Sequence, residues 1–108
     1  MVFNRVNWVS LNRDTHMKTK LAFAATLRAL RAERKVTQED FSVVSSRTYI
    51  SMLERGLKSP TLDKIEALAK VLKVHPLSLL YLTYMRAGGY RDANALLKRI
   101  RADLKDLI

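Results

Sequence analysis

The stretch whose residue types could do chemistry is SSRTYISMLERG, residues 45–56. At about 100° per residue around a helix, its polar side chains share one arc of roughly 140°. That arc holds Arg47, Thr48, Ser51, Met52 and Arg55. Arginine donates two hydrogen bonds to guanine, serine and threonine donate or accept, and threonine or methionine methyls touch the thymine methyl. The stretch therefore predicts a short helix that reads base edges in the major groove of DNA.

The opposite arc of this helix should fasten it to a protein core. It carries Tyr49, Ile50, Leu53 and Glu54. Ile50 and Leu53 are the expected apolar anchors, and Tyr49 is expected at the edge of the core. Simpler interpretations stay open at this point. A start rich in serine and threonine is also typical of a plain helix N-cap, and Met52 could belong to the core.

Helical periodicity before this stretch predicts two elements that position it. Apolar residues recur at three- and four-residue steps over residues 18–34, as expected of an amphipathic helix. Thr37 and Asp40 then have the spacing of a capping box, which starts a short second helix. The apolar side of that second helix is expected to consist of Phe41, Val43 and Val44.

The rest of the chain predicts four more helices and no strand. Ser46 can cap the third helix, residues 47–55, and Gly56 follows it as a C-terminal glycine should. Three further helices are expected over residues 62–74, 76–87 and 91–108. The fold class is therefore predicted to be all-α.

The charge balance indicates a polyanionic partner. The 108 residues carry a formal net charge of +10. Residues 17–60 hold nine basic and four acidic side chains, and residues 61–108 hold nine and five, so the excess lies in the folded part. Such a distribution favours nucleic acid over a membrane surface, although composition alone also fits a merely basic surface. With no cysteine, no signal-peptide pattern and no apolar run long enough to cross a bilayer, a cytoplasmic protein is expected.

Enzymatic chemistry lacks the residues that it would need. The sequence has no H-E-x-x-H, G-x-S-x-G or P-loop motif and no clustered carboxylates. Of the two histidines, His75 precedes a proline and is expected to help start the fifth helix rather than bind a metal. No catalytic residue, metal site or cofactor is predicted.

Three motifs stand in a fixed order and spacing: LRALRAERKVTQEDF, SSRTYISMLERG and SPTLDKIEALAKVLKVHP. Through them, residues 20–80 resemble the phage repressor/Cro (XRE-type) helix-turn-helix family of transcriptional regulators. The resemblance implies a five-helix domain that binds double-stranded operator DNA as a homodimer, with its third helix in the major groove. A C-terminal amphipathic helix would lie beyond that domain.

Matched by position, the resemblance assigns roles to individual residues. The base-facing positions of the family match Arg47, Thr48, Ser51 and Met52. The phosphate clamp at the start of the second helix matches Thr37 and Gln38. Further backbone-contacting positions match Arg55, Lys58 and Ser59. An ion pair that ties the first helix to the third matches Arg31 and Glu54.

The chain departs from the family pattern at two places. Family members usually have about two more residues, including a turn glycine, between the glutamine and isoleucine that match Gln38 and Ile50. The segment FSVVSSRTY has no glycine, so the second helix or the turn is expected to be shorter. Lys35 stands where the family often has glycine, so the corner after the first helix is expected to be strained or differently closed.

The C-terminal helix is the expected dimer contact. It aligns an apolar stripe opposite its charges, formed by Leu96, Leu97, Ile100 and Leu104. Packing of this stripe onto the protein's own first and fifth helices is the alternative. Residues 1–16 are expected to be an N-terminal extension, disordered or non-native, residues 17–87 the DNA-binding domain, and residues 88–108 the dimerisation helix.

The predicted function is a repressor that binds an inverted-repeat operator as a dimer. One alternative is an antitoxin-like protein, which neutralises a toxin partner and also binds its own operator. Residues 1–16 and the sixth helix are then the candidate partner segments. A restriction–modification controller is a further option within the regulator class.

Overall fold

The structure, a computed structural model, describes residues 15–90 and 92–108. Its elements are α2 (Thr15–Glu33), η1 (Gln38–Val43), α3 (Arg47–Glu54), α4 (Leu62–Leu72), α5 (Pro76–Gly88) and α6 (Ala93–Leu104). η1 is a 3₁₀ helix and the others are α-helices. Every regular element in the described ranges is helical, which confirms the predicted all-α fold. None of the described helices is long and apolar enough to cross a membrane.

The first helix starts earlier than the sequence predicts. It was expected from Lys18 to about Arg34 and is observed over Thr15–Glu33. Thr15 and His16, which were assigned to the N-terminal extension, therefore belong to α2. The rest of the predicted extension, residues 1–14, lies outside the described residues.

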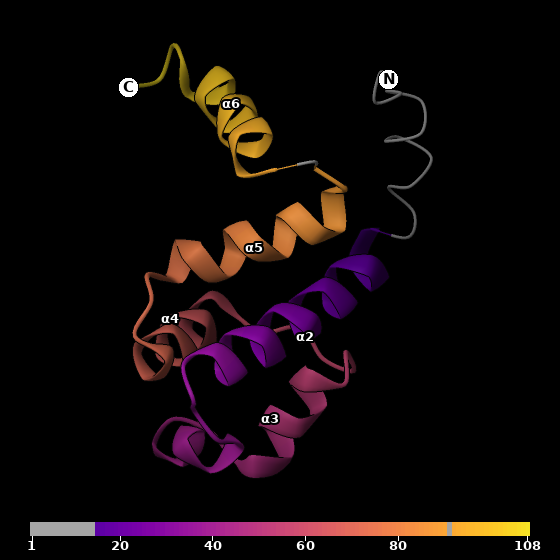
Figure 1. The fold of residues 1–108 in the computed structure, drawn as a ribbon, viewed down its shortest axis with the longest axis vertical. Coiled ribbons are helices and arrows are strands. Elements are labelled where there is room, and N and C mark those ends of the chain that lie inside the picture. Colours follow the sequence, from indigo (N-terminus) through magenta and orange to yellow (C-terminus); the bar gives the residue numbers. More distant parts are fainter. Residues whose placement is uncertain (1–14, 91) are drawn as a thin grey trace.

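One hydrophobic core joins five of the helices. α2 and α5 run alongside each other through the middle of the molecule, and α3 and α4 lie on the side away from α6 (Figure 1). Burial of each large apolar side chain contributes about 1.5–3 kcal/mol. The core consists of Phe23, Leu27, Phe41, Ile50, Leu53, Ile65, Leu68, Ala69, Leu72 and Leu79.

Side-chain caps begin the helices that follow α2. Each capping side chain accepts a hydrogen bond from a backbone amide two or three residues ahead, which satisfies an otherwise unpaired donor. The capping residues are Thr37, Ser46, Thr61, His75 and Asp92. At α5 the His75 Nδ1 accepts from the Leu77 amide at 3.0 Å, so the predicted role of this histidine at the start of the fifth helix is confirmed.

The corner after α2 is closed by a lysine in the left-handed conformation. Lys35 has φ 56°, a region that residues with a Cβ seldom adopt. The Val36 amide then donates to the Arg31 carbonyl at 2.9 Å. The expectation of a strained corner at Lys35 is confirmed. The end of α3 is conventional by comparison, because Gly56 takes the positive φ of 73° there.

The second helix is 3₁₀, and this changes its buried side. Phe41 is fully buried and Val44 packs against the core, whereas Val43 is 82% exposed. The prediction that Val43 belongs to the apolar side is therefore wrong. In a 3₁₀ helix the side chains of residues i and i+3 are aligned, so Val44 rather than Val43 follows Phe41. A 3₁₀ helix of six residues also meets the expectation of a short second element.

Burial at η1 leads to a stability prediction with an internal control. Phe41→Ala should lower the free energy of unfolding by about 3–5 kcal/mol, because it leaves a cavity in the core. Val43→Ala, two residues away on the exposed side, should change it by no more than about 0.5 kcal/mol. Urea unfolding at one fixed protein concentration measures both values. Similar losses for the two variants would contradict the 3₁₀ register.

Candidate DNA-binding surface

The outer arc of α3 lies at the protein surface. Arg47, Thr48 and Arg55 are exposed, while Ser51 and Met52 are partly exposed. On the opposite arc Ile50 and Leu53 are fully buried, and Glu54 joins them. The two arcs are thus divided as the helical spacing predicts, and the five residues predicted to face DNA share the solvent side.

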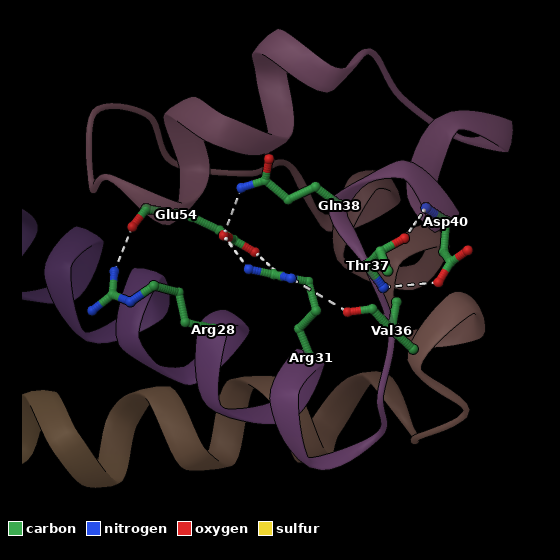
Figure 2. Close-up of polar contacts among 7 residues, drawn as sticks. All are labelled: Arg28, Arg31, Val36, Thr37, Gln38, Asp40 and Glu54. Atoms are coloured by element: carbon green, nitrogen blue, oxygen red, sulfur yellow. Dashed lines mark hydrogen bonds and ion pairs between the residues drawn. The ribbon is translucent and has the colours of Figure 1, made fainter.

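The buried carboxylate of Glu54 collects donors from two other elements (Figure 2). Arg31 of α2 binds it with both ends of its guanidinium, Nε to Oε2 at 2.6 Å and Nη2 to Oε1 at 3.0 Å. Gln38 of η1 donates through Nε2 to Oε1 at 2.9 Å. The Glu54 side chain is 5% exposed and that of Arg31 26%. Two parallel charge-assisted bonds are the strong form of a carboxylate–arginine contact.

The same donors also fasten the backbone around α3. Arg31 Nη1 donates to the Val36 carbonyl at 3.4 Å, at the corner between α2 and η1. Arg28, one helical turn before Arg31, donates to the backbone carbonyl of Glu54. Because α2, the corner and the end of α3 all meet here, this Glu54 cluster (Arg28, Arg31, Gln38 and Glu54) fixes the C-terminal end of α3.

The two residues of the predicted phosphate clamp, Thr37 and Gln38, already make hydrogen bonds within the protein. Thr37 and Asp40 form a reciprocal capping box, with Asp40 N to Thr37 Oγ1 at 3.2 Å and Thr37 N to Asp40 Oδ2 at 2.8 Å. The Gln38 amide nitrogen is bound to Glu54, so its contact here is with the ion pair. A phosphate contact by Thr37 and Gln38 stays a prediction.

The N-terminal end of α3 is held from α4. Lys64 donates through Nζ to the Val44 carbonyl at 3.0 Å and to Ser45 Oγ at 3.4 Å. The same ammonium lies 5.3 Å from the centroid of the Tyr49 ring. Burial raises the pKa of the Tyr49 phenol above its ordinary value, so the ring stays neutral at physiological pH. Ser46 Oγ caps the helix by accepting from the Tyr49 amide at 3.1 Å.

Sequence reasoning missed two residues of this arrangement, Arg28 and Lys64. Arg28 had a usable signal, because it lies three residues before Arg31 and so on the same side of the helix. Lys64 had none, because it reads as an ordinary charged position in an amphipathic helix. Lys58 and Ser59 are exposed in the segment between α3 and α4, next to Arg55 at the end of α3. No group of three His, Cys, Asp or Glu in the described ranges could hold a metal ion.

Comparison with known proteins finds sequence similarity over the part of the chain that forms this surface. A helix-turn-helix family model matches residues 27–79. The chain is 39% identical to Control protein C.BamHI of Bacillus amyloliquefaciens over 67 residues. This matched segment covers 59% of this chain and 83% of C.BamHI. The chain belongs to the XRE-type helix-turn-helix family. No solved structure matches it at a significant level.

Family membership indicates what kind of protein carries the outer arc of α3. The matched range includes η1, α3, α4 and the whole Glu54 cluster. The protein is a DNA-binding helix-turn-helix transcriptional regulator and belongs to a non-enzymatic family, as the sequence motifs predict. Four of the five outer-arc residues lie in α3 and the fifth, Arg55, is its C-cap, so the arc is the solvent-facing side of the third helix of this regulator.

The Glu54 cluster predicts a large difference between two glutamates. Glu54→Ala should lower the free energy of unfolding by about 3–5 kcal/mol, because it leaves the half-buried Arg31 guanidinium without its carboxylate. Glu33→Ala is the control, because Glu33 is 75% exposed and lies 3.7 Å from Arg34 in a surface pair. It should change stability by at most about 1 kcal/mol. Thermal and urea unfolding compare the two, and a double-mutant cycle of Arg31 and Glu54 with coupling near zero would refute the cluster.

Proposed function

We propose that this regulator represses transcription by binding an inverted-repeat operator, sequence-specifically, as a two-fold dimer in the cytoplasm. The observation that carries the proposal is the fixed, outward-facing arc of α3. Ile50 and Leu53 are buried and Glu54 is bound by donors of α2 and η1, so the arc is presented by a rigid support. A rigid reader is what discrimination between base edges requires.

Two classes of contact follow from the positions of the side chains. Base edges would be read by Arg47, Thr48, Ser51 and Met52, which lie on the outer arc. The sugar–phosphate backbone would be held by residues at the start of η1, at the end of α3 and in the segment after α3: Thr37, Gln38, Arg55, Lys58 and Ser59. The net charge of +10 supports the second class, because phosphate contacts dominate affinity for DNA.

An apolar groove between α5 and α6 supports the dimer. Its lining includes Leu77, Tyr81 and Tyr84 of α5 together with Leu97 and Ile100 of α6, and its volume is about 750 Å³. Of the predicted stripe, only Leu96 is buried within the chain, at 6% exposure, whereas the other three members are 38–40% exposed. Within the chain Leu96 is thus covered, and Leu97, Ile100 and Leu104 stay available for contact with a second surface.

A second copy of this chain is the occupant that DNA binding favours. One helix-turn-helix touches few base pairs, and useful specificity over a genome normally needs two half-sites about one turn of DNA apart. A two-fold axis through the groove would place the same apolar residues against each other. Arg99 and Asp103, paired at 3.2 Å on the rim of the groove, would supply both signs of charge to the edge of such an interface.

The similarity to a control protein favours one role among those that the sequence leaves open. C.BamHI is named as a control protein, and 83% of its length matches this chain. A controller of a restriction–modification system is therefore the preferred setting. An antitoxin would instead place a different protein in the α5–α6 groove, so the mass of the complex in solution distinguishes the two.

The two classes of contact predict different losses on DNA. Arg47→Ala should weaken binding to the preferred operator by about 1–3 kcal/mol and relax the preference at one base pair. Lys58→Ala should weaken all sequences alike and lower the salt slope by about 1. Selection from a random DNA pool defines the operator, and titrations at several salt concentrations measure both variants. Equal losses on operator and random DNA for Arg47→Ala would sink the base-reading assignment.

The groove predicts an effect of charge on assembly. Ile100→Glu places a carboxylate in the proposed interface and should convert the dimer to monomer, because an unpaired charge there would lose its water. Leu107→Glu is the control, since Leu107 lies beyond α6, is 74% exposed and does not line the groove. Sedimentation gives the masses, and binding to whole and half operators gives the consequence for DNA. A dimer that survives Ile100→Glu would remove this groove as the interface.

A further inference from the structure

The turn before α3 is short and carries no glycine. Only Val44, Ser45 and Ser46 separate η1 from α3. The Val44 amide still donates to the Phe41 carbonyl at 2.9 Å, so one side of the turn is tied to η1. The Val44 carbonyl and the Ser45 hydroxyl lie on the other side, toward α4.

Lys64 is the residue of α4 that meets this side of the turn. Its amide is capped by Thr61 Oγ1 at 3.1 Å, which anchors the backbone of Lys64 in the first turn of α4. Its ammonium reaches back about 20 residues to Val44 at 3.0 Å and Ser45 at 3.4 Å and lies over the Tyr49 ring. Val44 and Ser45 belong to the connection between η1 and α3, and Tyr49 belongs to the first helical turn of α3.

Charge makes these contacts stronger than ordinary turn contacts. A hydrogen bond from an ammonium to a carbonyl is stronger than one between neutral groups, and a cation over an aromatic face gains further attraction when it is partly desolvated. Lys64 is itself half-buried. The ammonium can therefore hold the Val44 carbonyl, the Ser45 hydroxyl and the Tyr49 ring in one arrangement. These contacts lie at the connection before α3, which lacks the turn glycine usual in the family.

We propose that Lys64 is a positioning residue for sequence recognition, which sets the entry angle of α3 from its N-terminal end. The proposal rests on the proposed function. α3 has eight residues and two supports: the Glu54 cluster at its C-terminal end and Lys64 at its N-terminal end. Arg47 and Thr48 are at the end that Lys64 holds, so loss of Lys64 releases the residues that read bases.

A positioning role and a direct phosphate contact leave different traces. A shift of α3 harms hydrogen bonds to base edges, which need an accurate distance and direction. It harms phosphate contacts little, because these depend on charge more than on register. Positioning thus predicts loss of discrimination with an unchanged salt slope, whereas a phosphate contact predicts equal loss on all DNA with a lower slope.

The test compares three variants of α4 on the operator selected by the wild type and on random DNA. Lys64→Met keeps the apolar stem and removes the charge, and it should reduce operator affinity about tenfold or more. Affinity for random DNA and the salt slope should stay unchanged. Lys64→Arg should restore most of the discrimination because it keeps a cationic donor. Lys70→Met, an exposed lysine of the same helix, is the control and should behave as the wild type.

Other results would overturn the proposal. Equal losses on both DNAs with a salt slope lowered by about 1 would make Lys64 a phosphate contact. A lower melting temperature with unchanged discrimination would make it a plain structural residue. A wild type that binds operator and random DNA equally would overturn the proposed function as well, which separates the two failures. If Lys64→Met does not fold, Tyr49→Leu removes the ring beneath the ammonium, and unchanged discrimination in that variant overturns the proposal.

Discussion

A carboxylate removed from water must be paired, and the positions of α2, η1 and α3 depend on the pairing of the Glu54 carboxylate. Its donors come from α2 and η1, while Glu54 itself belongs to the last turn of α3. Displacement of any of these elements would leave a buried charge without its partners, which is far more costly than the loss of one neutral hydrogen bond. The carboxylate thereby couples the long helix α2 to η1 and α3, two short elements that have little stability alone. Apolar packing around Ile50 and Leu53 then fixes which side of α3 faces outward.

Local features of this fold are visible in the sequence because neighbouring residues create them. The capping box of Thr37 and Asp40 and the terminal glycine at Gly56 need only a few residues of context. The two arcs of α3 follow from helical spacing in the same way. The Arg31–Glu54 pairing came from the family resemblance, since nothing in its spacing of 23 residues would bring the two together. The expectation of a strained or differently closed corner also came from the resemblance, because Lys35 stands where the family often has glycine.

Other features depend on how separate elements meet, and spacing does not predict them. Val43 was misplaced because the prediction applied α-helical spacing to a segment that adopts the tighter 3₁₀ form. Gln38 lies against Glu54 only because η1 packs on α3. Lys64 reaches the turn only because α4 packs beside η1. For Gln38 and Lys64 the partner is distant in the chain, and the contact exists only after the core has formed.

The outer arc of α3 and the α5–α6 groove lie at different places along the longest axis of the molecule. α3 lies toward one end and α6 at the other (Figure 1), in a body that measures 42 × 30 × 23 Å. Substitutions on the outer arc of α3 can therefore accumulate during evolution without touching α6. Two gene copies that had diverged in their preferred DNA would still pair with each other through the proposed interface. They would form mixed dimers on hybrid sites until α6 diverged as well.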